Sequence, residues 1–208
     1  MTSTQVTKKL SLSSIVTMEV SLFVIALLGI RFTSLALDGA DGSIWRYVLA
    51  GTVAGTITYG LAVLIFRWAH AFSASLRELI SKVRSAVAHF NLAAILSIAA
   101  CAAIGEEALF RVFAQSWIDQ FAPGWAAILI ASVLFAAAHA ISLAYFAITL
   151  VLGLLIGSAF AYTDSIALAI SWHFSYDFLS LLVLTRYPGV LFLSAHRNSS
   201  ATRTNGHS

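Results

Sequence analysis

The sequence predicts an all-α fold: a polytopic membrane helix bundle of about six transmembrane helices with one interfacial amphipathic helix. Of the 208 residues, 60% are hydrophobic and only 10% are charged, and the mean hydropathy is +0.89. Because a soluble globular domain carries about 25% charged residues, this chain could not cover its apolar surface in water. The same composition excludes disordered, collagen-like and disulfide-stabilised classes of protein.

Six apolar segments make up most of the chain, and each is long enough, or nearly long enough, to cross a bilayer. Their approximate ranges are 12–37, 47–66, 90–117, 125–143, 144–162 and 165–185. Between the second and third segments, residues 67–89 alternate charged and apolar side chains at helical spacing, so that the two kinds would lie on opposite faces of a helix. This pattern is typical of an amphipathic helix at the membrane surface.

The segments divide the chain into three regions. Residues 1–89 form an N-terminal membrane region with two spans and the interfacial helix. Residues 90–186 hold the other four spans, and residues 187–208 form a polar C-terminal tail.

Two pairs of glycines within the spans are spaced for close helix packing. Gly51 with Gly55, and Gly153 with Gly157, are each four residues apart. Small residues at this spacing let two membrane helices approach closely, so we expect both pairs to lie at helix contacts.

The basic residues fall on one side of the six-span bundle. Cytoplasmic loops of membrane proteins are enriched in Lys and Arg. Nine such residues lie before the first span, after the second or after the sixth: Lys8, Lys9, Arg67, Arg77, Lys82, Arg84, Arg186, Arg197 and Arg203. The alternate loops are mainly acidic, with Arg46 as the main exception: Asp38, Asp41, Asp119 and Asp164. We therefore expect both termini to be cytoplasmic.

Seven ionisable side chains remain inside the apolar segments. They are Glu19, Glu106, Glu107, Arg111, His139, His173 and Asp177. A charged side chain at the bilayer centre costs about 2.5–3.5 kcal/mol even on the most lenient scale, so such residues face the bundle interior and are functional candidates. Glu19 has no obvious partner in the sequence and stays unassigned.

Two adjacent acids on the third span, Glu106 and Glu107, should point in different directions. Glu107 and Arg111 are four residues apart and can form an ion pair on one helix face. Glu106 is rotated by about 100° from Glu107 around the helix, so we expect it to face another surface as the unpaired carboxylate.

The fourth and sixth spans carry the two histidines. Phe135 and His139 are four residues apart, which places an aromatic ring one helical turn from an imidazole. His173 and Asp177 repeat the spacing, so Asp177 can orient the His173 ring. Taken singly, a histidine could serve an interhelical hydrogen bond and Phe135 could be a packing residue. The joint pattern on three helices favours a site.

These residue types can support hydrolysis by an activated water. Glu106 and His139 could share general acid–base work, and His173 could donate to a developing oxyanion. Asp177 would orient His173, or would have to be protonated if it touched the oxyanion itself.

The motifs resemble those of a known family. Residues 106–111 read EExxxR, residues 135–139 read FxxxH and residues 173–177 read HxxxD, in that order on successive apolar segments. This order is similar to that of the CPBP family of intramembrane proteases, which includes type II CAAX prenyl endopeptidases and relatives linked to bacteriocin processing and immunity. The resemblance covers about residues 93–185; the preceding part matches only as membrane-spanning.

The resemblance implies an endopeptidase that cuts a membrane-associated protein or peptide. Its other expected partner is the lipid bilayer, and no nucleic-acid partner is expected. It implies an integral, multi-pass protein of a bacterial cell membrane. It further implies catalytic roles for four residues, with Glu106 as base, His139 assisting it, and His173 and Asp177 forming the oxyanion site. Supporting roles fall to three more: Glu107, Arg111 and Phe135.

The spacing does not decide whether a metal takes part. Members of the family have been described both as metalloproteases and as metal-independent glutamate proteases. Glu106, His139 and His173 would suit a zinc ion with an open water position, yet the HExxH spacing is absent. We favour a mechanism without a cofactor.

Three other functions stay open at the level of sequence. Intramembrane Glu, His and Asp residues also line proton-coupled transporters, although the chain shows no inverted repeat. His139 and His173 could be axial ligands of a haem, which would leave the EExxxR motif unexplained. The same fold could also act as a non-catalytic partner or immunity protein.

Overall fold

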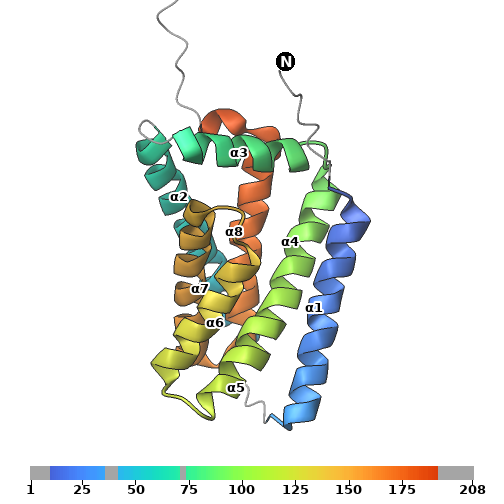
Figure 1. The fold of residues 1–208 in the computed structure, drawn as a ribbon, viewed down its shortest axis with the longest axis vertical. Helices are drawn as coiled ribbons and strands as arrows, with labels where there is room; N and C mark the ends of the chain where they lie inside the picture. The colour runs from blue at the N-terminus through green and yellow to red at the C-terminus, as the bar shows by residue number, and fades with distance from the viewer. Residues whose placement is uncertain (1–9, 36–41, 71–73, 192–208) are drawn as a thin grey trace, which may run out of the picture.

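The computed structural model describes residues 10–35, 42–70 and 74–191, and all regular secondary structure in these ranges is helical (Figure 1). Several residues used above for orientation lie outside these ranges: Lys8, Lys9, Asp38, Asp41, Arg197 and Arg203.

Eight α-helices, one π-helical segment and one 3-10 turn make up the described chain. They are α1 (Leu12–Thr33), α2 (Ile44–His70), α3 (Ala74–Val87), α4 (Leu92–Glu107), η1 (Ala108–Gln115, π-helical), α5 (Ser116–Asp119), α6 (Gly124–Ala138), α7 (Leu143–Thr163), α8 (Ile166–Arg186) and η2 (Pro188–Val190, 3-10).

Five helical stretches of the described chain are long and apolar enough to cross a membrane. They are Leu12–Thr33, Ile44–Trp68, Leu92–Asp119, Leu143–Thr163 and Ile166–Arg186. The third of these runs without a break through α4, η1 and α5. The outward faces of α1 and α2 carry many exposed Leu, Ile and Val side chains, as expected for helices that meet lipid. The protein is an integral membrane helix bundle.

The fourth expected span is shorter than the sequence suggested. Instead of reaching residue 143, α6 has 15 residues, or about 22 Å at 1.5 Å per residue. It ends at His139, whose ring nitrogen Nδ1 donates to the carbonyl oxygen of Phe135 at 2.9 Å, where a continuing helix would place a backbone N–H. Ser142 then caps α7 by accepting from the backbone N–H of Tyr145. The connection between α6 and α7 therefore stops short of the end of the bundle at which α3 lies (Figure 1).

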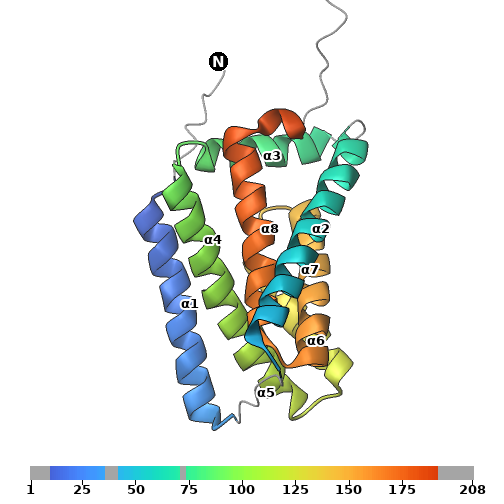
Figure 2. The same ribbon diagram turned by 180° about the vertical axis from the view of Figure 1, so that it is seen from behind.

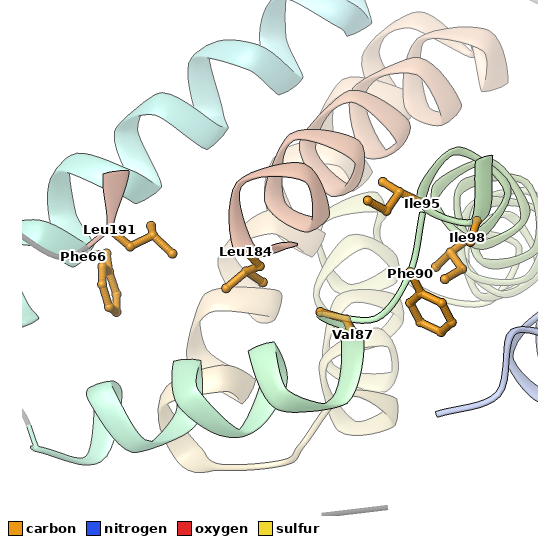
Figure 3. Packing of buried hydrophobic residues seen from close by; sticks show 8 residues of the cluster. Phe66, Val87, Phe90, Ile95, Ile98, Leu184 and Leu191 are labelled. Atoms are coloured by element: carbon orange, nitrogen blue, oxygen red, sulfur yellow. The ribbon is translucent and has the colours of Figure 1, made fainter. Parts of the chain in front are cut away.

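Helix α3 lies across one end of the bundle, and α1 begins and α8 ends at that same end (Figures 1 and 2). Its apolar side covers a core contributed by α2, α4 and α8 as well as α3 (Figure 3). The labelled members are Phe66, Val87, Phe90, Ile95, Ile98, Leu184 and Leu191. On the outer side, Lys82 pairs with Glu78 at 2.7 Å, and this hydrogen bond lowers the pKa of the Glu78 carboxyl. The predicted amphipathic helix is confirmed.

Basic residues gather at the α3 end of the described bundle. These are Arg67 near the end of α2, Arg186 at the end of α8, and three in α3: Arg77, Lys82 and Arg84. Asp119 and Asp164 lie at the opposite end, together with Arg31 and Arg46. Arg186 also ties α8 to α4, because its Nη2 donates to the Phe90 carbonyl at 3.3 Å.

Glycines set the closest helix contacts, as their spacing predicted. A Cβ on Gly51 would overlap the carbonyl oxygen of Leu168, and one on Gly55 would overlap that of Trp172. Helix α2 can therefore lie directly against the backbone of α8. A Cβ on Gly153 would lie 3.2 Å from Cβ of Ser132 and 3.3 Å from a ring carbon of Phe135, so α7 and α6 also pack closely there, though without overlap.

We predict that Gly55→Ala destabilises the bundle by about 1–3 kcal/mol, since the added methyl group meets backbone that cannot rotate away. Thermal unfolding of the purified protein in detergent measures the change. Gly60→Ala on the same helix is the matched control, because a Cβ there meets nothing within 4 Å. Equal unfolding temperatures for the two variants would contradict the proposed α2–α8 contact.

Candidate active site

Glu106 lies between two imidazoles that come from two other helices. Its Oε1 is 3.5 Å from Nε2 of His139, and its Oε2 is 3.9 Å from Nε2 of His173. The residue is only 4% exposed. Its carboxyl group is therefore buried in an apolar interior, and two imidazole nitrogens lie near it. Helices α4, α6 and α8, which are distant in sequence, thus meet at one point.

Glu107 joins the two other charged groups of the site. Its Oε2 is 3.0 Å from Nε of Arg111, and its Oε1 is 2.7 Å from Nδ1 of His173. Glu107 and Arg111 are both 0% exposed. The predicted ion pair is present, and the carboxylate uses its second oxygen to hold the imidazole of α8 in one orientation.

Asp177 lies beside His173, as the four-residue spacing predicted. The shortest hydrogen bond to that ring, which the sequence did not indicate, comes from Glu107. The Oδ2 of Asp177 lies 3.4 Å from Nε2 of His173, on the side of the ring that faces Glu106. Its side chain is 30% exposed, so Asp177 stands at the more open edge of the site.

His139 has one nitrogen fixed and one directed into the site. Because a carbonyl oxygen can only accept, the hydrogen bond to Phe135 requires the proton on Nδ1. Nε2 is then the nitrogen that faces Glu106. The position of His139 at the end of α6, rather than inside the helix as expected, leaves its side chain 25% exposed.

Phe135 packs at the centre of the group. Its ring centroid lies 4.7 Å from that of His139 and 5.8 Å from that of His173. The guanidinium carbon of Arg111 lies 5.3 Å from the same ring centre, a cation–π geometry. The ring therefore packs against three polar side chains of the site.

The helix after the two acids is π-helical, which the sequence did not indicate. Segment η1 begins at Ala108, directly after Glu107, and includes Arg111. The backbone N–H of Ser116 donates to the carbonyl of Arg111, five residues back, and the Ser116 hydroxyl donates to the same oxygen at 3.2 Å. π-Helical turns are uncommon and occur frequently at functional sites. No Pro or Gly lies within the segment, so only the packing around it could have revealed the change of helix type.

Two further side chains lie near the site and received no role from the sequence analysis. Tyr145, in the first turn of α7, has its ring 6.3 Å from that of His139 and interacts electrostatically with Asp177 and Glu106. Within an apolar segment, a tyrosine gives no signal that distinguishes it from a membrane-interface residue. The other is Glu19, which was identified as ionisable but left without a role.

The sequence left open a zinc ion held by Glu106, His139 and His173. Among the described residues, no three His, Cys, Asp or Glu side chains are placed to share one ion. His173 has one ring nitrogen bonded to Glu107 and the other close to two carboxylates.

Comparison with known proteins supplies the family. No curated protein and no solved structure matches the chain. A family model described as Type II CAAX prenyl endopeptidase Rce1-like matches residues 87–179, which hold all three motifs and every residue of the site except Glu19. The resemblance drawn from the motifs is confirmed: residues 87–179 match the type II CAAX prenyl endopeptidase Rce1-like family model.

Proposed function

We propose that the protein is an intramembrane endopeptidase that hydrolyses a peptide bond of a membrane-associated protein or peptide. The observation that carries this proposal is the position of Glu106, a buried carboxyl group held 3.5 Å from Nε2 of His139. The family match supports the same reaction class. The basic residues at the α3 end favour placing that end in the cytoplasm.

Glu106 and His139 act together on one water. Their 3.5 Å separation is longer than a strong direct hydrogen bond, and a water can bridge two polar groups at such a distance. Glu106 accepts a proton from this water as the water oxygen attacks the peptide carbonyl carbon. His139, with its other nitrogen held by Phe135, keeps the water and the carboxylate in line.

His173 stabilises the negative charge that develops on the carbonyl oxygen. Glu107 accepts the hydrogen bond from Nδ1, so the imidazolium form also presents an Nε2–H toward the site. A preorganised donor of this kind is effective in a site that excludes water. Asp177 stabilises the imidazolium from the side of the ring opposite Glu107, near Nε2.

Collapse of the intermediate completes the reaction. The C–N bond breaks as Glu106 returns its proton to the leaving nitrogen, and the water oxygen stays on the new carboxyl group. The buried pair of Glu107 and Arg111 takes no proton in this sequence; it holds His173 in place.

We predict that Glu106→Gln lowers kcat by about 10²- to 10⁴-fold, because an amide cannot accept the proton of water. Cleavage of a membrane-anchored reporter peptide by the enzyme in proteoliposomes measures the loss. Glu78→Gln, on the exposed face of α3, is the matched control and should cleave at the wild-type rate. Full cleavage by Glu106→Gln would remove Glu106 as the base.

Removing one member of the buried ion pair should destabilise the fold. We predict that Glu107→Gln lowers the free energy of unfolding by about 3–5 kcal/mol, since it leaves the buried Arg111 charge without a counter-ion. The double variant Glu107→Gln, Arg111→Met should recover stability but not cleavage, because His173 still lacks its carboxylate. A single variant as stable as the wild type would contradict the buried pair.

Chelation tests the absence of a metal. We predict that incubation with a strong chelator leaves reporter cleavage unchanged, because protein groups alone activate the water. Dialysis followed by metal analysis provides the control that metals have been removed. Loss of cleavage that zinc restores would overturn the metal-free mechanism.

A further inference from the structure

Glu19 is a buried acid that the proposed reaction does not use. It lies on α1, outside the residues that match the family, and is only 3% exposed. Its Oε2 is buried and has no hydrogen-bond partner among the described residues. Burial of an unsatisfied carboxyl oxygen is costly, so a partner is required.

The backbone places Glu19 beside the catalytic turn of α4. Helix α1 approaches α4 at Gly105, the residue before Glu106. A Cβ on Gly105 would lie 2.5 Å from the Glu19 carbonyl oxygen and 3.5 Å from its Oε2. Only glycine permits this approach. Glu19 is close enough to interact electrostatically with four side chains of the site: Glu106, His173, His139 and Asp177.

Within the described ranges, Glu106 also has a carboxyl oxygen without a hydrogen-bond donor. Its Oε2 is also buried and, in the part of the chain that is described, accepts no hydrogen bond. Two neighbouring carboxyl groups in a low-dielectric interior repel one another when both are ionised, and they can share one proton instead. A protonated Glu19 would supply the O–H donor that Glu106 lacks.

The charges of the site favour the uncharged form of Glu19. Three carboxylates, Glu106, Glu107 and Asp177, face three groups that can be cationic: Arg111, His139 and His173. These can balance each other. An ionised Glu19 would add a surplus negative charge to a buried site.

We propose that Glu19 is a positioning residue of the active site, which in its uncharged form donates a hydrogen bond, through one bridging water, to Oε2 of Glu106. Oε1 is then left to accept the proton of the water beside His139. This inference rests on the proposed function. It also means that the matched residues 87–179 do not complete the site, because α1 supplies one of its groups.

Three substitutions at two sites test the role of Glu19 in the full-length protein with the reporter peptide. Glu19→Gln keeps a neutral hydrogen-bond donor and should retain kcat to within about threefold, whereas Glu19→Leu removes the donor and should lower kcat by about 10- to 100-fold. KM should stay unchanged in both, because Glu19 does not contact substrate. Val20→Leu, at an exposed position on the same helix, controls for changes to α1.

Either of two kinetic results would overturn the inference: wild-type kcat in Glu19→Leu, or a Glu19→Gln enzyme as slow as Glu19→Leu. Infrared spectroscopy gives a readout that does not depend on activity. The band of a protonated carboxyl should be present in the wild type and absent from Glu19→Gln, and a wild type without that band would also overturn it.

Glu106→Gln separates this inference from the proposed function. If Glu106→Gln is inactive while both Glu19 variants match the wild type, only the role of Glu19 fails. If Glu106→Gln cleaves normally, Glu106 is not the base and the proposed mechanism fails whatever the Glu19 variants do; a wild type that leaves the reporter uncut contradicts the endopeptidase function itself.

Discussion

The site depends on one buried carboxylate, Glu107, which holds two groups at once. One oxygen binds Arg111 within the same helical segment, and the other binds His173 on α8, 66 residues further along the chain. Since all three groups are nearly or completely buried, the carboxylate cannot exchange these partners for water. It therefore fixes the distance between α4 and α8 at the level of Glu106, and the geometry of the reacting groups follows from that distance.

Close helix packing makes this arrangement possible in a membrane. Lipid offers no hydrophobic driving force between helices, so their association depends on packing and on polar contacts. Gly51 and Gly55 allow α2 to pack closely against α8, and Gly105 allows α1 to pack closely against α4. Gly105 in particular lets α1 place Glu19 against the helical turn that carries Glu106, so a packing feature determines which acid lies next to the site.

Local patterns predicted much of this structure. Composition and apolar runs predicted the membrane bundle, and the four-residue spacing predicted the pair of Glu107 with Arg111. The early end of α6 and the π-helical turn after Glu107 were not predictable in this way. Both depend on side-chain contacts made after folding. The bond from Glu107 to His173 was missed because it joins distant segments, whereas the contact of Asp177 with His173 follows from their four-residue spacing.

The central claim is that Glu106 and His139 act as a unit on one water. A double-mutant cycle tests it most directly, by measuring kcat for Glu106→Gln, His139→Ala and the double variant with the same reporter peptide. Groups that act as a unit show strongly non-additive losses. The account predicts that the double variant is no slower than Glu106→Gln alone. Losses that multiply in the double variant would show that the two residues act independently and would contradict the account.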